Sequence, residues 1–170
     1  IAVFGEGFLA HRNNESLRRA LKEGELTTQE FYQELLRLVY RLIFLLVADD
    51  RNALLLPDAP AEAKQFYLDN YSTRRIRRLA EEIRGTHHSD LFESLKVVMA
   101  LLHRSGREAL ALPALGSYLW SPEAAAHLGT CAIDNRSFLT AIGKLAFTVK
   151  GKNRWRTDFR SLGSEELGSV

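Results

Sequence analysis

The stretch 144–160 carries the side chains best suited to binding a phosphate backbone. It holds six lysines and arginines against one acid, Asp158, and three aromatic residues lie among them. Basic residues that alternate with aromatic ones can neutralise phosphates and stack on bases together. We therefore predict nucleic-acid contacts from Lys150, Lys152, Arg154 and Arg156. The alternative is a surface hairpin in which Trp155 and Phe159 fill the core while the basic residues face water.

A second group of basic residues follows Ser72 and is typical of an amphipathic helix. Five arginines (Arg74, Arg75, Arg77, Arg78 and Arg84) accompany two glutamates, and we expect all five to lie away from the apolar face of Ile76 and Leu79. Arg77 and Arg78 each have a glutamate four residues later, a pairing worth a few tenths of a kcal/mol. Arg74 and Arg75 have none, so they are the second pair of DNA-contact candidates. The alternative is a helix face that is simply solvated.

Two further patterns could indicate a cofactor or a metal. Gly5 to Ala10 matches the G-x-G-x-x-A phosphate-binding pattern, but no strand precedes it and no βαβ unit follows. We interpret it as a glycine-rich loop at the start of the chain, with Phe8 and Leu9 anchored in the core. His87, His88 and His127 with the lone Cys131 lack the spacing of a zinc site or a nucleophile pair. We assign no catalytic, cofactor-binding or metal-ligating residue.

Hydrophobic periodicity predicts the helices that must position these residues. Thr27 and Glu30 have the spacing of a capping box, and the residues from there to Asp49 are apolar on nearly every side. This pattern predicts a buried central helix with one polar stripe of Gln33, Arg37 and Arg41. Further helices are predicted at 14–21, 61–71, 73–84, 90–105, 122–129 and 135–147, with Asp90 as an N-cap and Gly129 as a helix end.

Only the segment 147–155 suggests strands, turning at 150–152. We therefore expect an all-α fold, an irregular multi-helix bundle around the central helix with one small β-hairpin near the C-terminus. The 170 residues fit a single domain, and a net charge of +2 is too mild to indicate a nucleic-acid binder by itself.

Cysteine content and hydropathy bear on the compartment. One cysteine excludes an intramolecular disulfide framework, which fits a reducing cytosol. No signal peptide is visible, and the longest uncharged part of the central apolar stretch, Leu42 to Ala48, is far shorter than the ~20 residues that span a bilayer. We expect a cytoplasmic protein without membrane contact.

Several segments resemble one protein family over essentially the whole chain. The most specific are the run from Phe31 to Arg51 and the closing Glu-Glu-Leu-Gly-Ser-Val of 165–170; weaker ones are 7–11, 71–72, 90–92, 95–98 and 112–116. They resemble the helical region upstream of the catalytic domain in large class I N6-adenine DNA methyltransferases. These enzymes belong to restriction–modification and phage-defence systems, including type IIG enzymes.

The resemblance implies that the chain is a fragment of a larger, S-adenosylmethionine-dependent methyltransferase. Residues 164–170 would then begin a linker helix into the catalytic domain, which would be this module's partner, with double-stranded DNA as a second partner. The family's Asn/Asp-Pro-Pro-Tyr/Phe motif is absent, since no two of the four prolines are adjacent. No catalytic or cofactor residue is therefore transferred to this chain, and the fragment itself needs no cofactor.

Three functions remain open at this point. The preferred one is a non-catalytic helical module that packs on the methylase domain and contacts the DNA backbone. The second is a pure protein–protein interaction or scaffold module without DNA contact. The third, a small-ligand enzyme built on Gly5 to Ala10, is the least supported.

Overall fold

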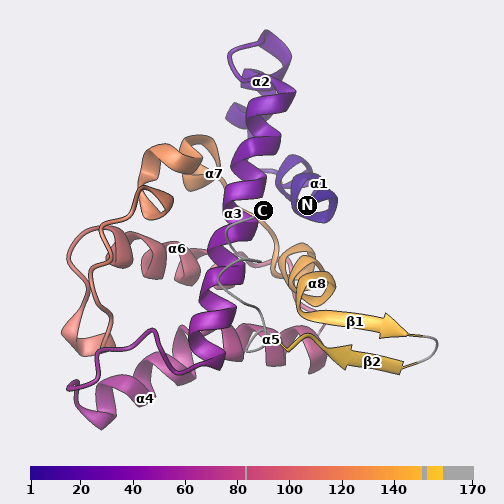
Figure 1. Ribbon diagram of the computed structural model, residues 1–170. Helices are drawn as coiled ribbons and strands as arrows, with labels where there is room; N and C mark the ends of the chain where they lie inside the picture. Colours follow the sequence, from indigo (N-terminus) through magenta and orange to yellow (C-terminus); the bar gives the residue numbers. More distant parts are fainter. Residues whose placement is uncertain (83, 151–152, 159–170) are drawn as a thin grey trace.

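The computed structural model describes residues 1–82, 84–150 and 153–158, and within them the chain is helical with one two-stranded hairpin (Figure 1). This confirms the predicted all-α bundle with a small hairpin. The longer helices are α1 (Ala2–Ala10), α2 (Glu15–Glu23), α3 (Thr28–Asp50), α4 (Ala61–Asn70), α5 (Thr73–Glu82), α6 (Asp90–His103) and α8 (Asn135–Ala146). Between α6 and α8 lie the short 3-10 helices η1 (Glu108–Leu110), η2 (Tyr118–Trp120) and η3 (Pro122–Ala125), followed by α7 (Ala126–Thr130).

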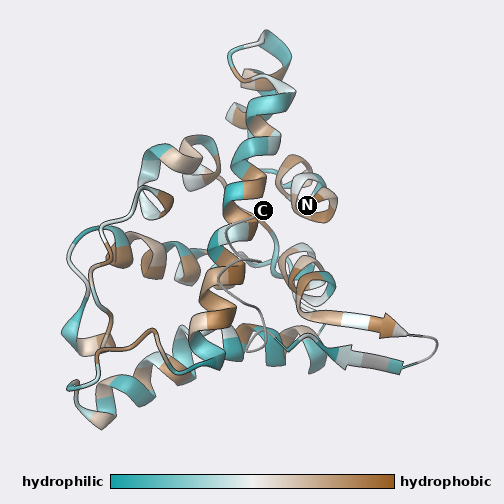
Figure 2. Cartoon of the chain, in the orientation of Figure 1, coloured by the Kyte–Doolittle hydropathy of each residue, from teal (hydrophilic) through white to brown (hydrophobic). Residues whose placement is uncertain are grey.

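Helix α3 runs through the middle of the molecule, as predicted (Figure 1). Its start is fixed by the predicted capping box: the Thr27 hydroxyl accepts from the Glu30 amide at 3.1 Å, and the Glu30 carboxylate accepts from the Thr27 amide at 2.8 Å. Hydrophobic residues concentrate in the half of the helix nearer α5, where Leu42 and Leu45 are fully buried (Figure 2). This half forms the centre of the hydrophobic core.

Residues 5–10 lie in helix α1, so the predicted glycine-rich loop is wrong. The glycines allow close helix packing instead: a Cβ on Gly7 would lie 2.7 Å from Ile133 Cδ1 and 2.9 Å from Ser137 Cβ. Phe8 is buried as expected and meets the Phe92 ring edge-on at 5.3 Å, but Leu9 is 37% exposed. Gly7 therefore serves the contact between α1 and the start of α8, whereas Gly5 faces Leu35 of α3.

The start of α6 departs from the prediction by one residue. Ser89 occupies the N-cap position, and Asp90 is the first helical residue. Asn135, the first residue of α8, accepts from the Leu91 amide at 3.2 Å and donates to the Asp90 carboxylate at 2.8 Å. The orphan amide at this helix start is thus satisfied by a neighbouring helix, which a local sequence pattern cannot reveal.

The irregular segment between α6 and α8 is held by the polar stripe of α3. Arg41 is buried and donates from Nε to Leu119 O at 2.5 Å and from Nη2 to Ser121 O at 2.8 Å. Arg37 donates to Ala124 O at 3.1 Å. These arginines therefore supply hydrogen bonds to carbonyl groups of a backbone that lacks regular secondary structure. Burial lowers the pKa of the Arg41 guanidinium.

The predicted helix at 122–129 also changes. It divides into η3 and α7, and α7 continues through Gly129 to Thr130, so Gly129 does not end it. The buried Glu34 carboxylate of α3 accepts from the backbone amides of His127 and Leu128 at 3.1 and 3.0 Å. A tertiary contact therefore fixes where α7 begins.

The predicted hairpin is present as β1 (Phe147–Lys150) and β2 (Asn153–Arg156), paired antiparallel with Phe147 opposite Arg156 and Thr148 opposite Trp155. Phe147 is buried where the hairpin leaves α8, whereas Val149, two residues further on the same face, is 69% exposed. The two strands extend beyond the helices at the right of Figure 1.

Candidate nucleic-acid interface

Arg74 and Arg156, predicted from two separate stretches of sequence, line the same surface hollow. The hollow measures about 540 Å³, and Asp50, Asn52, Thr157 and Asp158 complete its lining. It forms where the end of α3, the start of α5 and the end of β2 meet. The fold therefore brings together one residue from each predicted DNA-contact group.

Arg77 is not on the solvated face where the sequence pattern placed it. Its guanidinium donates to both carboxylate oxygens of Asp50, at 2.9 and 2.6 Å, and the two side chains are only 3% and 7% exposed. Thr73, Ile76 and Arg77 are the buried residues of α5, which is the spacing of one helix face. Asp50 lies under α5, so Arg77 completes the buried face of this helix although it is charged.

Asp50 also accepts from Arg156 Nη2 at 2.9 Å, so one carboxylate bridges two arginines. The Arg77 contact is bidentate and buried, whereas the Arg156 side chain is 56% exposed. Exposed ion pairs contribute only about 0–1 kcal/mol to stability. Arg156 is therefore the more exchangeable of the two cations.

The neighbouring carboxylate, Asp49, anchors the start of α5. It accepts from the backbone amide and hydroxyl of Thr73 at 2.7 and 2.5 Å, and from the Tyr67 hydroxyl at 3.2 Å. Burial raises the pKa of Asp49, and these hydrogen bonds oppose the shift; burial also raises the pKa of Tyr67. Asp49 fixes the helix that presents Arg74.

Arg74 is half-buried and contacts the end of α3. One guanidinium nitrogen donates to the backbone carbonyl of Asp49 and, at 2.6 Å, to the Asn52 side chain. A cation at this place complements the negative end of the α3 dipole. Arg75 is also half-buried but is not among the residues that line the hollow.

The structure gives less information on the other predicted DNA-contact residues. Lys150 ends β1 and Arg154 lies in β2, opposite Val149. Lys152 lies outside the described residues, as do Phe159 and the predicted linker-helix start at 164–170. Trp155 is 59% exposed, so the alternative in which it fills the core is wrong. The hairpin thus places an exposed indole next in sequence to Arg156, which lines a hollow of two arginines and two aspartates.

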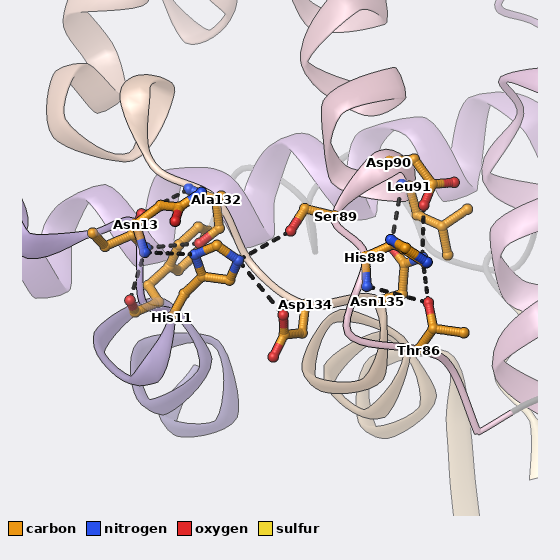
Figure 3. A network of polar contacts seen from close by, with 12 residues as sticks. His11, Asn13, Thr86, His88, Ser89, Asp90, Leu91, Ala132, Asp134 and Asn135 are labelled. Carbon is orange, nitrogen blue, oxygen red and sulfur yellow. Dashed lines mark hydrogen bonds and ion pairs between the residues drawn. The ribbon is translucent and has the colours of Figure 1, made fainter.

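A second polar network, around His11, was missed by the sequence reasoning (Figure 3). His11 Nε2 lies 3.2 Å from Ser89 Oγ and 3.5 Å from Asp134 Oδ1, while Nδ1 accepts from the Asn13 amide at 3.3 Å. In a Ser-His-Asp triad the serine and the acid contact opposite ring nitrogens. Here both contact Nε2, so Asp134 cannot orient the ring while Nε2 takes a proton from Ser89, and the arrangement is not that of a catalytic triad.

Asn14 gives this network its structural role. Its side chain donates to Phe8 O and Ala132 O at 2.8 and 2.7 Å, and accepts from the Ala132 amide at 2.9 Å. The contacts join the turn after α1 to the segment before α8. Only the pairing of residues 118 positions apart reveals this role, and the sequence carries no local signal for it.

Cys131, His87 and His88 are further residues that the sequence offered for chemistry. Burial raises the pKa of the Cys131 thiol to about 11, which keeps it protonated near neutral pH. His87 and His88 are exposed and stack on each other, with ring centroids 4.3 Å apart. In the described ranges, no three histidine, cysteine, aspartate or glutamate side chains converge to hold a metal ion.

Comparison with known proteins gives no further assignment. No known protein family matches the sequence, and neither a curated protein nor a solved structure shows significant similarity to it. Among the described helices, none is both long and apolar enough to cross a membrane.

Proposed function

We propose that this chain is a non-catalytic helical module of an adenine-specific DNA methyltransferase of the restriction–modification type, and that it contacts the DNA backbone. The resemblance of the run from Phe31 to Arg51 supports the family. The parent enzyme would use S-adenosylmethionine in its catalytic domain, on which this module would pack. The module contributes position and charge, and no residue of it takes part in methyl transfer.

The observation that carries the DNA contact is that Trp155 and Arg156, successive residues of β2, both have exposed side chains, at 59% and 56%. An aromatic side chain left in solvent next to basic residues suits a partner that presents both charge and flat apolar surface. The DNA backbone presents phosphate charge together with the apolar C–H groups of its sugars. Beyond Phe147 and Arg156, which pair at its base, the hairpin extends away from the helices (Figure 1).

The charge arrangement around Asp50 supports the same contact. Arg77 already satisfies this carboxylate with two hydrogen bonds, so transfer of Arg156 to a phosphate leaves Asp50 paired. A phosphate oxygen offers the arginine a charge-assisted bond of the same kind as the one it gives up. The exchange therefore costs little, and the released counterions favour it at low salt.

The interaction-module alternative rests on a different observation. Several large apolar side chains are exposed on other elements: Tyr32, Phe66, Val97 and Tyr118. Such residues are ordinary when scattered singly, but they also occur where another domain packs. In this alternative the module contacts only protein, and Arg156 stays bound to Asp50.

A DNA titration separates the DNA-contacting module from the interaction module. The chain is titrated with a labelled duplex of about 20 base pairs at salt concentrations between about 50 and 200 mM. We expect weak binding that falls as salt rises and that Arg156→Gln weakens. Lys22→Gln is the matched control, because Lys22 is an exposed cation on α2, away from the hollow. Binding that Lys22→Gln weakens as much as Arg156→Gln, or no binding at the lowest salt, would favour the interaction module.

Calorimetry with S-adenosylmethionine addresses the third function, a small-ligand enzyme at residues 5–10. We expect no binding, because these residues form a helix packed on Ile133 and Ser137, which leaves no phosphate-binding loop. Micromolar binding of this cofactor would contradict the assignment of the chain as a non-catalytic module.

A further inference from the structure

A second surface hollow, of about 920 Å³, lies beside the start of α4, where the loop before this helix faces η1. Apolar residues make up most of its lining: Leu56 and Phe66, which is 51% exposed, lie among prolines and alanines. Three carboxylates, Asp58, Glu62 and Glu108, stand among these apolar residues. In the part of the chain that the structure describes, no lysine or arginine lines this hollow.

The walls of the hollow are held in place by hydrogen bonds outside it. The Leu56 amide donates to Ala111 O at 2.8 Å, which ties the loop to the segment after η1. Lys64 Nζ donates to Pro57 O at 2.6 Å, and this lysine lines a different hollow together with Leu68. The site is therefore formed before any partner arrives, which lowers the entropic cost of binding.

The chemistry of the hollow selects its occupant. Three carboxylates with no lysine or arginine in the described lining repel phosphate, so nucleic acid is a poor partner here. The apolar lining favours a large apolar side chain, while the three carboxylates favour positive charge next to it. We propose that this hollow docks a basic segment of a partner protein, with one bulky apolar side chain on Phe66 and Leu56 and flanking lysines or arginines facing the carboxylates.

This docking site is separate from the proposed DNA contact. Helix α4 and the hairpin lie at opposite sides of the view in Figure 1. The two hollows share no lining residue and differ in charge, since one combines Arg74 and Arg156 with two aspartates and the charged lining residues of the other are all acids. The module could then hold a basic protein segment on one side while DNA lies on the other.

The test uses a fluorescein-labelled peptide of sequence Lys-Arg-Leu-Trp-Arg-Lys, titrated with the full chain and followed by fluorescence anisotropy. Two matched peptides replace the basic residues by glutamates or the Leu-Trp pair by two serines. We expect saturable binding of the first peptide with a Kd below about 1 mM at low salt. Both matched peptides should bind at least about tenfold more weakly, because each lacks one half of the complementarity.

Variants of the chain locate the binding. Glu62→Gln with Glu108→Gln, and separately Phe66→Ala, should each weaken the basic peptide by about fivefold or more. Glu23→Gln with Glu25→Gln is the control, because these exposed glutamates flank the turn between α2 and α3. Equal weakening by the control pair, binding of the acidic peptide as tight as that of the basic one, or no saturable binding up to about 1 mM would each overturn the proposal. Thermal melts of all variants confirm that each is folded.

Discussion

The Asp50 carboxylate accepts hydrogen bonds from both terminal nitrogens of the Arg77 guanidinium, at 2.9 and 2.6 Å, and neither side chain is more than 7% exposed. The pair joins the end of α3 to the buried face of α5. Removal of a charge from water is costly, and the fold recovers that cost only because the two groups meet in a bidentate geometry. The relationship also sets the charge of the neighbouring hollow, since Arg156 shares the same carboxylate.

The first prediction concerns this pair. Asp50→Ala should lower the free energy of unfolding by about 3–5 kcal/mol, because Arg77 is then buried without a partner. Asp50→Ala combined with Arg77→Met should recover much of the loss, since an apolar side chain of similar length carries no charge to bury. Urea denaturation measures both. A single variant as stable as the parent chain would contradict the buried ion pair.

The second prediction separates two residues of α3 that the sequence pattern treated alike. Leu42 is fully buried, so Leu42→Ala should cost about 2–5 kcal/mol of unfolding free energy. Phe44 is 37% exposed and packs edge-on against Trp120 at 5.3 Å, so Phe44→Ala should cost less than about 2 kcal/mol. Equal losses in thermal or urea melts would contradict this ranking.

The contrast between these residues shows what the sequence could and could not predict. Local signals were sufficient for the Thr27 capping box, the central helix and the Phe147 hairpin, because each depends on neighbours in sequence. They were insufficient for Arg77, whose surroundings are set by Asp50, 27 residues away. Hydrophobic pattern marks a charged residue as solvated unless its distant partner is known.

The candidate site follows the same rule. The sequence predicted Arg74 and Arg156 as cations, but it could not place them around one hollow, because that placement depends on how α5 and β2 meet at the end of α3. Composition likewise gave no sign that Trp155 would be exposed while Phe147 is buried. The sequence was sufficient to name the candidate contact residues, but not to predict how they are arranged relative to one another.

The third prediction tests the glycine at the contact between α1 and α8. Gly7→Ala should destabilise the fold by about 1–3 kcal/mol, because the new methyl group would collide with Ile133 and Ser137 at under 3 Å. Gly129→Ala is the control, because Gly129 is also helical and a Cβ added there would meet no other atom within 4 Å. This variant should gain up to about 1 kcal/mol of stability from helix propensity. A Gly7→Ala variant as stable as the control would argue against this packing.

The fourth prediction concerns Asp49 and pH. Burial raises its pKa above the ordinary value of 3.8, so the folded chain binds this proton more tightly than the unfolded chain does. The stability that Asp49 contributes is therefore complete below that value and declines as pH rises through the raised pKa. We expect the unfolding free energy of the parent chain, minus that of Asp49→Asn, to fall with rising pH. A difference that rises with pH in urea titrations would contradict the buried carboxyl.

The last prediction concerns the proposed DNA contact as a whole. Replacing Lys150, Lys152, Arg154 and Arg156 together by glutamine should weaken duplex binding and flatten its salt dependence, with the melting temperature preserved. For each phosphate that the variant no longer neutralises, the slope of log affinity against log salt should become shallower by about 0.9. The parent chain should bind non-specifically, with a Kd of about 10⁻⁴ to 10⁻⁶ M near physiological salt, because no side chain is assigned to base edges.

Two single variants, Arg74→Gln and Arg75→Gln, test the second contact group. Arg74 lines the hollow with Arg156, so its replacement should weaken binding more than the replacement of Arg75. If the quadruple variant keeps the affinity and salt slope of the parent chain, the hairpin does not contact DNA, and the interaction module is favoured.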